Sequence, residues 1–106
     1  EDHLILPMLS IGAKGVVSVV ANIMPKEMKE LIAAFLNQEY EKAYKLHTEL
    51  YDVSRNMFIE GNPVTVKTAM KILGKIDNDI VRLPLVSCEE KTVDKLTKLF
   101  KQKGII

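Results

Sequence analysis

The sequence predicts a mostly α-helical chain with one short strand, forming the tail of an α/β protein. Three observations lead to this fold class. From residue 25 onward, apolar residues recur every three or four positions, as on one face of a helix. Residues 15–20 read Gly-Val-Val-Ser-Val-Val, a run typical of a strand that is buried on both faces. No other segment offers a convincing partner strand, and the order helix, strand, helix is that of a parallel α/β sheet.

The first part of the chain predicts two helices around this strand. Residues 4–13 are nearly all apolar and predict a short buried helix, with Pro7 in its first turn and Gly12 near its end. After the strand, Asn22 and Pro25 predict the start of a second helix. Its apolar stripe, spaced i, i+3, i+4, i+7 and i+8, consists of Met28, Leu31, Ile32, Phe35 and Leu36.

Two further helices are predicted in the middle of the chain. A break at 37–38 precedes a long helix over about 39–59. Its apolar seam, in steps of three and four, consists of Ala43, Leu46, Leu50, Val53 and Met57. Asn62 is then expected to cap a fourth helix, with Pro63 as its first residue and Gly74 at its end.

The C-terminal part predicts an irregular connection followed by a last helix. Within the connection, 75–86, the segment 83–85 (Leu-Pro-Leu) is expected to pack on the core in an extended form. Ser87 is followed three residues later by Glu90, which matches a capping box. The last helix should therefore begin there and run to about Gln102.

Composition indicates an ordinary soluble domain. The 15 Lys and Arg residues balance 14 Asp and Glu residues for a net charge of +1, which argues against a nucleic-acid or membrane partner. A single cysteine cannot form an internal disulfide, so a reducing, cytoplasmic location is expected. No apolar run reaches the roughly 20 residues that a membrane helix needs.

Residue spacing alone points to no catalytic centre. His3 and His47 lie far apart and Cys88 is the single cysteine, so no metal site is expected. His47 is expected on the surface or in a packing role, and Cys88 as a passive residue of a first helical turn. Residues 12–15 are only loosely similar to a phosphate-binding loop, because they precede a predicted strand rather than a helix.

Three motifs resemble the dihydrodipicolinate synthase family. Residues 9–22 (LSIGAKGVVSVVAN) resemble its last barrel strand and the approach to that strand. Residues 60–67 resemble its E-x-N-P-x-P-V-K stretch, with Thr65 in place of the second proline, and residues 82–85 resemble its R-L-P-L segment. Order and spacing agree over all 106 residues, which would correspond to about the last third of the family's chain.

The resemblance implies a (β/α)8 TIM barrel followed by a C-terminal helical extension, with residues 1–38 ending the barrel and residues 39–106 forming the extension. It implies a lyase, a homo-oligomer, that condenses pyruvate with aspartate semialdehyde through a lysine Schiff base in lysine and diaminopimelate biosynthesis. No cofactor is implied, because the protonated imine is itself the electron sink. The Schiff-base lysine and the relay tyrosines lie upstream in the family. A polypeptide of these residues alone is therefore expected to hold no catalytic residue and to be inactive.

Four residues match substrate-binding positions of the family. Glu1 and Asp2 match an acidic pair after the seventh strand, near the mouth of the active site. Val17 matches an apolar position of the eighth strand that lines the pyruvyl pocket, and Gly15 lets the backbone come close there. The top of the barrel is where such enzymes bind their substrates.

Two alternatives stay open at this point. A related pyruvate-dependent aldolase, similar to N-acetylneuraminate lyase, shares the glycine-rich strand and would differ upstream, in the residues that select the second substrate. A non-enzymatic helical interaction domain would have to hold residues 15–20 in its own core. That arrangement would leave several backbone groups of the strand without hydrogen-bond partners.

Overall fold

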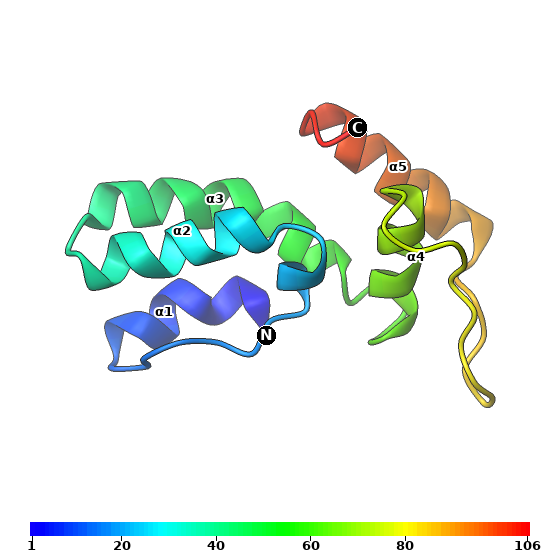
Figure 1. Ribbon diagram of the computed structural model, residues 1–106, viewed down its shortest axis with the longest axis horizontal. Coiled ribbons are helices and arrows are strands. Elements are labelled where there is room, and N and C mark those ends of the chain that lie inside the picture. The colour runs from blue at the N-terminus through cyan, green and yellow to red at the C-terminus, as the bar shows by residue number, and fades with distance from the viewer. The chain divides into compact units, whose positions relative to one another are not determined.

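The structure is a computed structural model that describes all 106 residues. It contains five α-helices and two short 3-10 helices, and it has no β-strand (Figure 1). The chain divides into two compact units, Glu1–Arg55 and Asn56–Ile106, each of which buries its own apolar residues. None of the helices is both long enough and apolar enough to cross a membrane.

The first unit is helical throughout. Its elements are η1 (Asp2–Leu4), α1 (Ile5–Ser10), η2 (Val20–Asn22), α2 (Pro25–Leu36) and α3 (Tyr40–Asn56), the last of which ends one residue into the second unit. Helix α2 packs against both α1 and η2. Helices α2 and α3 are joined by a tight turn, and the rings of Phe35 and Tyr40 meet across it with their centroids 5.2 Å apart.

The sequence pattern explains the start and the packing of α2. Pro25 occupies its first turn, where a missing N–H costs nothing. Met28 and Leu31 from the predicted stripe are buried, and Ala34 is buried beside them. The helix ends before Gln38, which adopts the left-handed conformation with φ of 63°. The predicted break at this point is confirmed.

The second unit pairs α4 (Val64–Ile72) with α5 (Glu90–Gln102), and these two helices pack against each other. Met57, Leu96 and Phe100 are completely buried there. Gly74 and Gly104 follow the two helices with φ of 68° each, as glycines at C-terminal caps do. The long connection between α4 and α5 contains no helix or strand. Asp79 and Ile80 in it are bonded to α4, and Figure 1 shows the part that follows, in yellow to orange, looping away from both helices.

The predicted strand at 15–20 is wrong for this chain. Residues 13–18 have no regular secondary structure, and Val20 already belongs to η2. A strand requires a neighbour whose N–H and C=O groups complete its hydrogen bonds, and no other segment of the chain supplies one. Val17, expected to be buried, is instead 104% exposed relative to its reference state.

Helix boundaries differ from the predictions at three places. The helix predicted over residues 4–13 is α1, which ends at Ser10. Helix α3 ends at Asn56 rather than near residue 59. Helix α4 begins at Val64, so Pro63 is its N-cap residue rather than its first helical residue. Such shifts of one to three residues are expected, because terminal turns are held by few hydrogen bonds.

Two predictions for the connection before α5 are also wrong. Leu83 and Leu85 do not pack on the core, because they are 87% and 42% exposed. The predicted capping box at Ser87 does not form, since α5 begins at Glu90 with Glu89 as N-cap and no side-chain bond from that residue. The N–H of Glu89 instead donates to both carboxylate oxygens of Glu60, at 3.1 and 3.2 Å. A distant carboxylate thus accepts the N–H of the N-cap residue, as the glutamate of a capping box would.

Candidate functional site

Asp2 holds the segment that the family motif singles out. It lies in η1, and only 4% of its surface is exposed. Its Oδ2 atom accepts hydrogen bonds from the backbone N–H of Val19 at 3.0 Å and of Val20 at 3.1 Å. These groups begin η2, so a negative carboxylate meets the donors at the start of a helical turn. Asp2 therefore fixes where the extended segment ends.

The second oxygen of the Asp2 carboxylate is a buried polar atom without a partner. Oδ1 is buried from solvent and accepts no hydrogen bond. A buried acceptor left in this way usually costs free energy and is uncommon in a folded chain. The carboxylate thus has one oxygen committed to the backbone and one oxygen available to a donor.

The segment anchored by Asp2 is open to solvent. Val17 is fully exposed and Val16 is 36% exposed, although both are large apolar side chains. Gly15 is exposed as well, and a Cβ atom added to it would meet nothing within 4 Å. The close backbone approach predicted at Gly15 therefore has no counterpart within this chain, and it stays a prediction about a larger assembly.

Glu1 precedes Asp2 in the chain and is exposed at the surface. Its Oε2 atom is 3.4 Å from Nδ1 of His3. The structure therefore places Glu1 and Asp2 next to each other in different environments, one exposed and one buried. Their side-chain bonds join them to the backbone of Val19 and Val20 and to His3, and not to Gly15 or Val17.

A cluster that the sequence did not predict lies between η1 and α3. Nε2 of His3 is 3.5 Å from Nη1 of Arg55, and the His3 ring meets Tyr51 edge-on with centroids 6.1 Å apart. The ring of His47 meets the same tyrosine at 6.2 Å. Burial, and secondarily the nearby His3, lower the pKa of His47 below its usual value. The feature of the sequence that could have indicated this cluster is the i, i+4, i+8 spacing of His47, Tyr51 and Arg55, which places them on one face of a helix.

An open apolar groove of about 410 Å³ runs along the extended segment and α2. The residues that line it include Val16, Ala21, Met28, Ile32 and Leu36. Val16 on one side and the apolar stripe of α2 on the other give a mainly apolar surface that is open to water. Val16 joins this groove to the exposed segment, since it lines the one and belongs to the other.

These residues contain no complete catalytic centre. No three histidine, cysteine or acidic side chains come together in a way that could hold a metal ion. Lys14 is exposed on the extended segment, and no general base forms a hydrogen bond or ion pair with it. What the structure shows here is an exposed extended segment with a carboxylate that fixes its end.

Comparison with known proteins shows which family the chain belongs to. Residues 1–103 match the model of the dihydrodipicolinate synthetase family, so the chain belongs to that family. It is 46% identical to the 4-hydroxy-tetrahydrodipicolinate synthase of Geotalea uraniireducens and 43% identical to that of a Hydrogenobaculum strain. Both alignments cover all of this chain and 36% of the relative, so the chain spans about a third of their length.

Solved structures of dihydrodipicolinate synthases superpose closely on this chain. Dihydrodipicolinate synthase from Aquifex aeolicus superposes with a TM-score of 0.93 at 42% identity, over 98% of this chain and 35% of that one. The synthase from Thermotoga maritima gives a TM-score of 0.95 at 38% identity, over 100% of this chain and 36% of that one. A monomeric variant of the enzyme gives 0.94 at 38% identity, over 100% and 35%.

Proposed function

We propose that these residues form the C-terminal portion of a dihydrodipicolinate synthase, which condenses pyruvate with aspartate semialdehyde. In this proposal residues 1–38 complete a (β/α)8 barrel and residues 39–106 form the helical extension. The family match over residues 1–103 supports it, together with the 36% share of the relatives that the chain spans. The protein serves lysine and diaminopimelate synthesis in the cytoplasm and needs no added cofactor.

The observation that carries the proposal is the exposure of residues 13–18. An extended, valine-rich segment with Val17 fully exposed is unfavourable in water, since a fully exposed Val side chain forgoes about 1.5 kcal/mol or more of burial free energy. Neighbouring strands on both sides would pair its backbone and cover its side chains. The segment is thus a barrel strand in the complete protein, with Val17 facing the pyruvyl pocket.

The other candidate residues have supporting roles in this proposal. Gly15 leaves room for substrate or for a neighbouring backbone, because a Cβ atom added there would meet nothing within 4 Å beyond its chain neighbours. Asp2 fixes the strand's end through the N–H groups of Val19 and Val20, and its partnerless oxygen faces a donor from the missing part of the site. Glu1 stands at the mouth, exposed beside it.

The lysine that forms the imine lies in the remaining part of the barrel. Its protonated imine with pyruvate acidifies the neighbouring methyl group, which loses a proton to a base to give an enamine. The enamine carbon then attacks the aldehyde carbon of the second substrate, whose oxygen takes up a proton. A polypeptide of these 106 residues forms no such imine. Borohydride treatment with pyruvate, followed by mass spectrometry, checks this, and a covalent pyruvyl adduct on this polypeptide would contradict it.

A chimera tests the function itself. The matching 36% of the Geotalea uraniireducens synthase is replaced by this chain, and condensation of pyruvate with aspartate semialdehyde is measured. We expect a folded, active chimera, and a Val17→Asp version that folds but loses most of its activity. As a matched control, Val86→Asp changes an exposed valine, 69% exposed, outside the proposed strand and should stay active.

Two results of this experiment would overturn the proposal. One is a chimera that is folded by circular dichroism but cannot be trapped with pyruvate by borohydride. The other is a Val17→Asp chimera as active as the unchanged one, which would place Val17 outside the pocket.

The complete protein is proposed to be a homo-oligomer. A solved relative is described as the first monomeric dihydrodipicolinate synthase variant, which supports association as the more usual state. Size-exclusion chromatography with light scattering on the chimera checks this. A monomeric mass at micromolar concentration would contradict it.

A further inference from the structure

The second unit contains a cationic groove outside the site described above. It lies between α4 and the connection that follows it, has a volume of about 540 Å³ and is open to solvent. Lys67, Asn78 and Arg82 line it, and no acidic residue does. Its remaining walls are apolar, formed by Pro63, Ile80, Val81 and Leu85.

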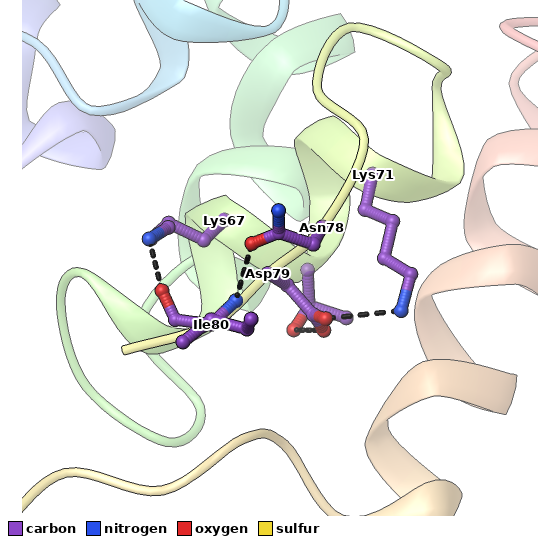
Figure 2. A network of polar contacts seen from close by, with 6 residues as sticks. Lys67, Lys71, Asn78, Asp79 and Ile80 are labelled. Carbon is purple, nitrogen blue, oxygen red and sulfur yellow. Dashed lines mark hydrogen bonds and ion pairs between the residues drawn. The ribbon is translucent and has the colours of Figure 1, made fainter. Parts of the chain in front are cut away.

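The charge of Lys67 is not neutralised within the groove. Its ammonium group donates a hydrogen bond to the backbone carbonyl of Ile80, which satisfies one N–H without supplying a negative charge (Figure 2). Arg82 forms no hydrogen bond or ion pair through its guanidinium, and its side chain is exposed. Two full positive charges therefore face one groove.

The nearby carboxylate is already engaged elsewhere. Asp79 accepts a hydrogen bond from Nζ of Lys71 at 3.0 Å and another from Oγ1 of Thr68 at 3.0 Å. The bond from Lys71 in particular lowers the pKa of the Asp79 carboxyl, so the group is ionised at neutral pH and Lys71 is its counter-ion. Figure 2 shows the two lysines of α4 directed to different partners, one to Asp79 and one to Ile80.

Asn78 adds uncharged donors at the same place. Its Oδ1 accepts the N–H of Ile80 at 3.2 Å, as Figure 2 shows. This bond fixes the amide plane, and the two Nδ2–H donors then have no acceptor in the chain. A guanidinium fork, an ammonium group and an amide together match the oxygens of a planar anion.

We propose that this groove binds a carboxylate whose carbon chain lies on the apolar wall, with Arg82 as the principal anchor and Lys67 and Asn78 as secondary donors. Arg82 is planar and offers two parallel N–H groups to two carboxylate oxygens. The alkyl chain covers Ile80 and Leu85, which are 69% and 42% exposed. This site is independent of the pyruvate chemistry proposed for the first unit.

Hexanoate is the probe, and NMR of backbone amides in the 106-residue chain is the measurement. We expect saturable shifts at the amides of residues 80–85 with millimolar affinity. Hexanol, which keeps the carbon chain and removes the charge, should bind at least about tenfold more weakly, because a charged hydrogen bond contributes about 1.5 kcal/mol or more. Inorganic phosphate, which has no carbon chain, should also bind more weakly than hexanoate.

Three variants distinguish hexanoate binding in this groove from a general effect of the chain's net charge. Arg82→Gln should lower hexanoate affinity about tenfold, and Arg82→Lys should restore only part of it, because the fork is lost. Arg82 is exposed and its side chain makes no bond in the chain, so the fold should be unaffected. Lys98→Gln, which removes an exposed charge from α5, should leave the affinity unchanged.

Several outcomes would overturn the proposal. The absence of saturable shifts at residues 80–85 would do so. Equal affinity for hexanol and hexanoate would show an apolar surface without anion recognition. Equal weakening by Lys98→Gln and Arg82→Gln would show that net charge alone is sensed.

Discussion

Removal of the Asp2 carboxylate should loosen the start of η2 selectively. In Asp2→Ala, the N–H groups of Val19 and Val20 lose the oxygen that accepts them at 3.0 and 3.1 Å. Val20 is completely buried, so water cannot replace that acceptor there. The side chain of Ala is also too short to reach either group.

The magnitude follows from two hydrogen bonds to a charged acceptor, each contributing about 1.5–3 kcal/mol. Part of this gain is offset by the cost of burying a carboxylate that leaves Oδ1 without a partner. Val19 is half-buried and can be partly rehydrated after the change. A net loss of about 2 kcal/mol in local opening free energy is therefore expected, which corresponds to about 30-fold faster amide exchange.

Native-state hydrogen exchange at the amides of Val19 and Val20 is the assay. Glu1→Ala is the matched control, since this neighbouring carboxylate is exposed and contacts only His3. Asp2→Asn should lose only about 1 kcal/mol, because its amide oxygen can still accept both N–H groups. The reasoning is refuted if Asp2→Ala changes exchange less than about threefold, or if Glu1→Ala has the same effect.

Three further predictions concern other parts of the chain. Glu60→Ala should destabilise the second unit by about 1 kcal/mol, the usual value of a helix cap, because the Glu89 N–H loses its acceptor. Urea unfolding measures this loss, and an unchanged unfolding midpoint would contradict the prediction. His47 should titrate by NMR below the ordinary histidine pKa of about 6.5. Its contribution to stability is therefore present above that pH and declines as pH falls through the lower folded pKa. His3→Gln should move the His47 pKa part of the way back, and no movement would exclude the coupling between the two rings. Gly74→Ala should cost about 1 kcal/mol in thermal or urea unfolding because φ is 68° there, and a neutral result would show that the turn rearranges.

Local patterns were sufficient to predict the helices. The apolar stripe that contains Leu31, the break before Gln38 and the glycine after α4 all depend on residues within one or two turns of each other. Helix hydrogen bonds join residues four apart, so short stretches of sequence contain nearly all the necessary information. The family motifs likewise depended only on the order and spacing of residues, and the family match over residues 1–103 confirmed them.

Long-range partners account for what the sequence did not predict. Glu60 caps α5 from 29 residues away, and no capping rule written over four residues could find it. His3 reaches Arg55 across 52 residues. The helical spacing of the residues on α3 was visible, but their partner on η1 was not.

The sequence by itself determined which stretches are helical, where most of those helices end and to which family the chain belongs. Only the tertiary structure decided the state of residues 13–18 and the role of Asp2. A strand is defined by the neighbours that complete its hydrogen bonds, and within this chain a buried carboxylate holds the end of the segment instead. The valine-rich sequence is suited to a sheet, and the absence of a partner strand in the chain leaves Val17 exposed.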